Sequence, residues 1–113
     1  MLKAAFLAHA PDAEPEQNKC VVETSKYKLY VVAVRSQEQA VKECTRLANE
    51  EGIHAVVLCP GFTNKNVGEL TEVLGMKVGV FVARGDGPST RSWMELMMKD
   101  GWFSLHPGAP VNR

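Results

Sequence analysis

The sequence has no surplus of charge of either sign: among its 113 residues, 13 lysines and arginines balance 13 aspartates and glutamates. Non-specific binding to nucleic acid depends on a basic patch that displaces counterions from phosphates, so nucleic acid is not an expected partner. Long hydrophobic runs are also missing, since none approaches the roughly 20 residues of a membrane-spanning helix. No signal-peptide pattern opens the sequence. We therefore expect a cytoplasmic protein that binds no membrane.

Cysteine and histidine are scarce and form no recognised metal-binding pattern. Cys20, Cys44 and Cys59 are odd in number and widely spaced, without a C-x-x-C pair. Such a set suits neither a disulfide framework nor a zinc site, and free thiols in a reducing cytosol are the simplest interpretation. The histidines form no H-x-x-H or H-E-x-x-H spacing. We therefore expect no bound metal and no cofactor.

The chain is long enough to bury a hydrophobic core as a single domain, residues 1–113, without disulfides or metal. Short apolar segments rich in β-branched residues predict its strands. These segments are residues 2–8, 20–24, 29–34, 55–58 and 78–83. The region 20–34 also fits a hairpin, which would place one antiparallel strand in the sheet.

Three amphipathic helices are predicted between and after these strands, from apolar residues at helical spacing. They begin at Ser36, at Thr63 or Asn64, and near Ser89, and end at Gly52, Gly75 and Gly101. Strands that are apolar on both faces and alternate with such helices indicate an α/β fold. We therefore expect a mostly parallel sheet of four or five strands, flanked by helices.

Several of these segments resemble a small family of uncharacterised prokaryotic α/β proteins of about this length. The residues that carry the resemblance are Ala5-Phe6-Leu7, Glu23-Thr24, Tyr30-Val31-Val32-Ala33-Val34 and the segment from Gly52 to Gly61. The likeness covers residues 2–84, and Pro60 departs from the small residue expected there. The family has no assigned activity, so the resemblance implies a fold and no particular reaction.

Polar residues follow the predicted strands at positions that a parallel sheet brings to one edge. In open sheets, ligands bind beyond the carboxyl ends of the strands, and helix N-termini at this edge favour anions. Two arginines there would suit a carboxylate or phosphate. The strand-end residues are His9, Arg35, Cys59 and Arg84, and the helix starts add Asn64 and Ser89.

These residues predict a site for a small anion, in which Arg35 and Arg84 face one shared cavity and His9 is the acid–base candidate. The alternative is that they are solvated polar residues at the ends of strands. Cys59 is interpreted as a small residue that ends a strand, with substrate contact or nucleophilic attack as alternatives. The glycine-rich turn 84–88 is likewise a plain turn or a phosphate cradle.

The C-terminal segment has more apolar residues than one sheet-facing stripe needs. Trp93, Leu96 and Met97 share a helical stripe, and Met94 and Met98 widen it. Tryptophan and methionine are enriched in interface cores. The segment 89–113 is therefore either buried by its own tail or part of an interface in a homodimer or higher oligomer.

Two functions follow from these observations. The first is binding, with or without transformation, of a small anionic metabolite at the carboxyl edge of the sheet. The second is a non-catalytic oligomeric or regulatory module that uses the C-terminal apolar surface. Nothing in the sequence selects a reaction type, so whether the protein is an enzyme stays open.

Overall fold

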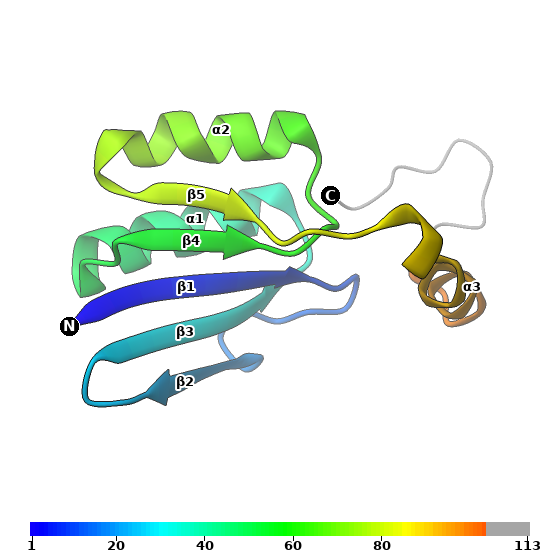
Figure 1. Cartoon of the computed structure of the whole chain (residues 1–113), viewed down its shortest axis with the longest axis horizontal. Coiled ribbons are helices and arrows are strands. Elements are labelled where there is room, and N and C mark those ends of the chain that lie inside the picture. Colours follow the sequence, from blue (N-terminus) through cyan, green and yellow to red (C-terminus); the bar gives the residue numbers. More distant parts are fainter. Residues whose placement is uncertain (104–113) are drawn as a thin grey trace.

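The sheet of this protein has five strands in the computed structural model, in which residues 1–103 are described. The order across the sheet is β2-β3-β1-β4-β5 (Figure 1). Strands β1, β3, β4 and β5 are parallel, and β2 runs antiparallel to β3. The α/β class is therefore confirmed, together with the single antiparallel strand. The strands are β1 (Leu2–His9), β2 (Lys19–Glu23), β3 (Tyr27–Val34), β4 (Ala55–Leu58) and β5 (Gly79–Val82).

Three α-helices and three short helical turns complete the described chain. Side-chain caps explain where two of the helices begin: Ser36 accepts the N–H of Gln39 at 3.2 Å, and Thr63 accepts the N–H of Asn66 at 3.1 Å. No described helix is long and apolar enough to cross a membrane. The elements are α1 (Gln37–Arg46), the π-helical turn η1 (Leu47–Glu51), α2 (Asn64–Leu74), η2 (Gly75–Lys77), η3 (Gly87–Ser89) and α3 (Arg91–Lys99).

The turn η1 fastens the end of α1 to the sheet. Gly52, with φ of 67°, ends it in the left-handed conformation that favours glycine. The wider π-helical turn leaves Glu51 where its carboxylate accepts a 2.9 Å hydrogen bond from the hydroxyl of Tyr30 on β3. The backbone carbonyl of Glu51 also accepts from Lys3 Nζ at 3.1 Å. The helix is thus held against β3 and β1 at the end of the sheet opposite the strand carboxyl ends.

The hydrophobic core lies between one face of the sheet and the pair α1 and α2, which contact each other. Helices α1 and α2 lie on the same side, and none of the helices described for residues 1–103 lies over the opposite face (Figure 1). Helix α3 projects beyond the carboxyl ends of the strands. The core side chains that are wholly buried include Leu7, Val34, Cys44, Val56, Leu58 and Leu70.

Candidate functional site

The carboxyl edge of the sheet contains a topological switch point between β1 and β4. The strand that follows β1 in the parallel set is β3, on one side of it, whereas β5 follows β4 on the other side. The connections after β1 and β4 therefore leave in opposite directions, and ligands of open α/β sheets bind in such a crevice. Two predicted site residues, His9 and Cys59, lie at this point.

His9 and Cys59 are brought into contact. The backbone N–H of His9 donates to Cys59 Sγ at 3.2 Å, and the backbone N–H of Cys59 donates to the carbonyl of Leu7 at 3.0 Å. The His9 ring packs edge-on against Phe62, with centroids 6.2 Å apart. A Cβ on Gly61 would lie 3.4 Å from the Cys59 sulfur and 3.5 Å from His9 Cβ. The sulfur therefore accepts a hydrogen bond inside a closely packed turn directly after β4.

Replacing Cys59 by serine tests its interpretation as a small residue that ends the strand. The serine oxygen can accept the same backbone N–H, so we expect the free energy of unfolding to change by less than about 1.5 kcal/mol, with little effect on ligand affinity. Urea denaturation of both proteins measures the change. Rapid labelling of Cys59 by iodoacetamide near pH 6, in a Cys20→Ser background, would instead indicate a reactive thiolate and revive the nucleophilic alternative.

Arg84 and Ser89 share a cavity of about 270 Å³ beyond the ends of β4 and β5. The segment after β5 passes close to the turn after β4, since a Cβ on Gly85 would lie only 3.1 Å from Pro60 Cβ. This close approach, which a larger side chain would disturb, sets one wall of the cavity. The residues that line the cavity are Pro60, Arg84, Gly85, Asp86, Ser89, Thr90 and Trp93.

The charged groups of this cavity are Arg84 and Asp86, which form an exposed ion pair. Arg84 Nε donates to Asp86 Oδ1 at 2.7 Å, and the arginine side chain is 86% exposed. The N-terminus of α3 adjoins the pair, and no side chain of the described residues caps it, because the Thr90 hydroxyl donates to the carbonyl of Gly87 instead. The start of α3, which lacks a side-chain cap, therefore borders the same cavity as the guanidinium.

Arg35 lies elsewhere on the edge. Its Nη1 donates to the carbonyl of Ala13 and to Glu14 Oε1, both at 2.9 Å, so the guanidinium holds the loop that follows β1. Strands β1 and β4 separate Arg35 from Arg84, which places their backbones roughly 14 Å apart at the usual strand spacing. Arg35 is not among the residues that line the Arg84 cavity. The structure thus does not bring the two arginines into that cavity together.

Asn64 is the first residue of α2, and the cap itself is Thr63. Asn64 therefore lies at the predicted helix start, on the carboxyl side of β4, but it does not line the Arg84 cavity. No group of three His, Cys, Asp or Glu side chains that could hold a metal ion occurs within residues 1–103.

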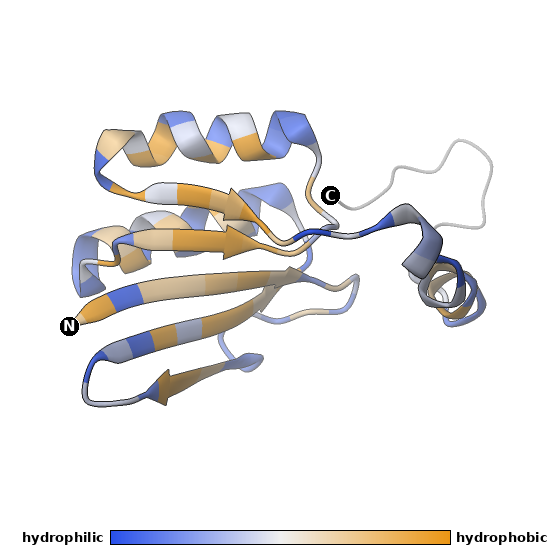
Figure 2. Ribbon diagram, viewed as in Figure 1, coloured by the Kyte–Doolittle hydropathy of each residue, from blue (hydrophilic) through white to orange (hydrophobic). Residues whose placement is uncertain are grey.

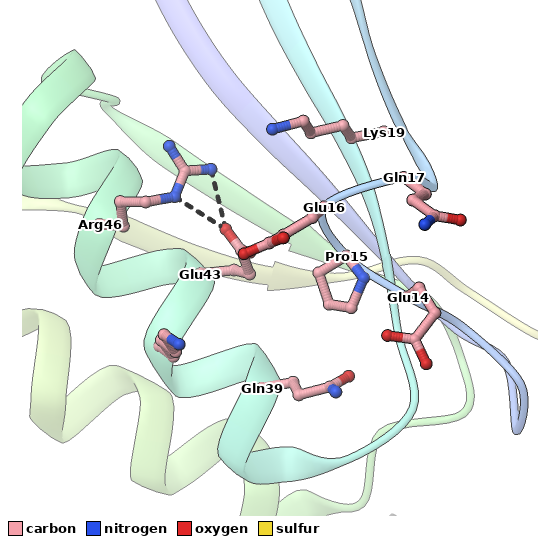
Figure 3. Close-up of a pocket in the computed structure, with 9 residues that line it drawn as sticks. Glu14, Pro15, Glu16, Gln17, Lys19, Gln39, Glu43 and Arg46 are labelled. Atoms are coloured by element: carbon pink, nitrogen blue, oxygen red, sulfur yellow. Dashed lines mark hydrogen bonds and ion pairs between the residues drawn. The ribbon is translucent and has the colours of Figure 1, made fainter.

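A larger cavity of about 600 Å³ lies between the loop after β1 and the outer side of α1 (Figure 3). Arg46 donates to Glu43 Oε2 through Nε at 3.0 Å and Nη2 at 2.8 Å, and this hydrogen bond to Glu43 raises the pKa of Arg46. Sequence reasoning missed this cavity, although the acidic, proline-containing loop and the charged spacing along α1 were its signals. Its lining comprises Glu14, Pro15, Glu16, Gln17, Lys19, Gln39, Lys42, Glu43 and Arg46.

Cations and carboxylates are equal in number in the larger cavity, with Lys19, Lys42 and Arg46 against three glutamates. An anion entering it would meet as much repulsion as attraction. The Arg84 cavity is balanced too, with one arginine and one aspartate, but it adds two hydroxyls and a helix N-terminus without a side-chain cap. It is therefore the better candidate for an anionic ligand.

Comparison with known protein families confirms the expectation of a small family with no assigned activity. Residues 2–97 match a family model described as a family of unknown function (DUF6506). The match extends from β1 into α3, so it includes both walls of the Arg84 cavity. No curated protein matches the sequence.

Proposed function

We propose that this chain, which belongs to the family of unknown function DUF6506, binds a small anionic ligand in the Arg84 cavity. The observation that carries the proposal is the gathering of four kinds of group around one space: a guanidinium, two hydroxyls, the start of a helix and an indole. Ligand pockets typically combine apolar walls with a few convergent polar groups of this sort.

The chemistry of the cavity suggests which part of a ligand each group would bind. Asp86 engages Nε of Arg84, and the terminal Nη groups carry further donors in a planar fork that suits a carboxylate or phosphate. Donors at the start of α3 favour the same charge. Trp93, 64% exposed, offers a flat apolar wall. A suitable ligand therefore has an anionic group and an adjoining planar or apolar part.

Other predicted residues extend this proposal along the edge. His9, at the switch point, is the acid–base candidate should the ligand be transformed, and no reaction is assigned. Arg35 and Asn64 stay predicted contacts of a longer ligand. The cytoplasmic location is likewise a proposal, consistent with three free thiols.

A thermal-shift screen against inorganic phosphate, nucleotides and carboxylic acids tests the proposal, because a ligand that binds only the folded state raises its stability. For a compound that stabilises the protein, we expect Arg84→Ala to weaken binding at least tenfold, since hydrogen bonds to charged groups contribute about 1.5–3 kcal/mol. Isothermal calorimetry measures the loss.

Arg91→Ala is the matched control for Arg84→Ala. Arg91 is equally exposed, at 89%, and pairs with Glu95 at 3.4 Å, but it does not line the cavity. It should leave the affinity within about twofold. Equal losses in both variants would show that only the overall charge matters and would contradict a site at Arg84.

The second candidate function, a non-catalytic module that associates with itself through the segment 89–113, is favoured by one observation. Helix α3 exposes Trp93, Met94, Leu96 and Met98, and its main contacts within residues 1–103 are with η3. Such a surface exceeds the scattered apolar residues usual on monomers. The tail 104–113 lies outside the described residues.

A further inference from the structure

We infer that the helix-free face of the sheet is a docking surface for α3 of a second copy of this chain. The inference rests on the second candidate function, self-association, and adds to it the surface that receives the helix. It follows from two apolar surfaces of the same chain, each of which lacks a covering layer among residues 1–103.

The first surface is the side of the sheet opposite α1 and α2, here called the open face. Strand register identifies its residues, because paired residues point to the same side. Phe6 pairs with Val31 and Val57, Val57 pairs with Phe81, and Val31 pairs with Cys20. None of these belongs to the core cluster beneath the helices. The strand residues of the open face are Leu2, Ala4, Phe6, Ala8, Cys20, Val22, Tyr27, Leu29, Val31, Ala33, Ala55, Val57, Gly79 and Phe81.

No residue in that set is charged, which distinguishes the open face from an ordinary solvated face. The helix-covered face, by contrast, carries Lys3, Lys28, Lys19 and Glu23. A sheet that faces water on one side normally alternates apolar and polar residues. Depletion of charge is the compositional mark of interface cores. The open face therefore has the composition of a covered surface. The ribbons of β4 and β5 are coloured mostly as hydrophobic (Figure 2).

The second surface is the apolar side of α3. Charged residues line one side of this helix, where Arg91 and Glu95 pair at i,i+4, and the large apolar residues occupy the remainder. The helix stands beyond the carboxyl ends of the strands at the end of an extended segment (Figure 1). An amphipathic helix of this kind is stabilised chiefly by packing its apolar side against a sheet or another helix.

The areas favour an exchange of helices over direct contact between two open faces. At strand spacings of about 4.8 Å and rises of about 3.3 Å per residue, the open face has a flat area of roughly 450 Å² and a somewhat larger accessible surface. Stable interfaces bury about 800 Å² on each partner. Adding α3 of each copy, roughly 14 Å long, supplies apolar area that the face alone lacks. A two-fold axis then produces two identical helix-on-sheet contacts, the usual closed arrangement.

Sedimentation velocity at micromolar concentration provides the first test. The protein should sediment as a dimer, and Val22→Asp, on the open face, should shift it to the monomer at the same concentration. Val73→Asp is the matched control, because Val73 on α2 is exposed to a similar degree, 48% against 55% for Val22, but lies away from the open face. A wild-type monomer would overturn self-association altogether, and a Val22→Asp dimer would overturn the role of the open face.

Cross-linking of mixed chains provides the second test and identifies the partners. In a Cys20→Ser background, a chain with Phe81→Cys is mixed with a differently tagged chain with Met94→Cys, and a short bis-maleimide is added. Cross-links between unlike chains should dominate. A predominance of Phe81→Cys pairs would mean that open faces pack directly, and a predominance of Met94→Cys pairs would mean that helices pair. Either result would overturn the helix-on-sheet arrangement while leaving self-association intact.

Two other possible occupants of the open face are α3 of the same chain and the segment after Phe103. Further variants test each of them. A chain carrying both cysteines should give cross-linked dimers, whereas purely intramolecular cross-links would show that α3 folds onto its own sheet and would overturn the inference. A chain ending at Phe103 should still dimerise, and its conversion to a monomer would overturn the sufficiency of α3. Ligand binding at Arg84 is measured separately, so either proposal can fail without the other.

Discussion

Leu70→Ala is expected to lower the free energy of unfolding by about 2–4 kcal/mol, a large part of the 5–15 kcal/mol typical of a domain. Leu70 is wholly buried and fixes α2 against the sheet within the core cluster. Truncation removes apolar contacts and leaves a cavity that neighbouring side chains fill only in part. Urea denaturation followed by circular dichroism measures the change.

Val73→Ala, one turn further along α2, is the control for this experiment. Val73 is about half exposed, and alanine is the better helix former by about half a kcal/mol. The variant should therefore match the wild-type stability or exceed it slightly. If the two substitutions destabilised the protein equally, α2 would not pack on the sheet by the face containing Leu70.

A Cys44→Ala variant should be less stable than the wild type at pH 7 and more stable near pH 11. Burial, followed by the nearby Glu43 carboxylate, raises the pKa of the Cys44 thiol to about 12, above the usual value of about 8.5. The folded state therefore holds this proton more tightly than the unfolded state. Its contribution is fully present below about pH 8.5 and is lost at up to about 1.4 kcal/mol per pH unit as the pH rises towards 12.

The comparison between variants isolates the Cys44 contribution from other alkaline effects. Burial and a hydrogen bond to Glu51 also raise the pKa of Tyr30, but Tyr30 is present in both proteins. Val73→Ala is the control, since Val73 is half exposed on α2 and its replacement changes no ionisable group, so the pH profile should stay parallel to that of the wild type. A constant difference between Cys44→Ala and wild type from pH 7 to 11 would show that Cys44 ionises normally in the folded state.

Features of the fold set by local chemistry were predictable from the sequence. Ser36 caps α1 because its hydroxyl can reach the N–H of Gln39, and Gly52 ends the helical segment because its φ is positive. Apolar runs identified all five strands, although β3 begins at Tyr27 rather than at residue 29. Periodicity could not reveal that α1 and α2 lie on one face, because that depends on the directions of the crossovers across the sheet.

The candidate site was predictable only as far as one rule extends, namely that ligands bind beyond the carboxyl ends of parallel strands. The approach of His9 to Cys59 follows from adjacent parallel strands ending at one edge. The hydrogen bonds of Arg35 to Ala13 and Glu14 could not be predicted, because they depend on the path of a long loop. The same loop forms one wall of the larger cavity. Its acidic and proline residues were visible in the sequence, but the approach of the loop to α1 was not.

The central place of β1 in the sheet has a consequence for the order of events during synthesis. β1 is made first, yet its neighbours are β3 and β4, and the second of these ends at Leu58. At synthesis rates of about 5–20 residues per second, β1 waits roughly 2–10 seconds for β4 to be made. Until then its apolar side chains have no complete layer to join, and the unpaired edge of β1 is open to pairing with other chains.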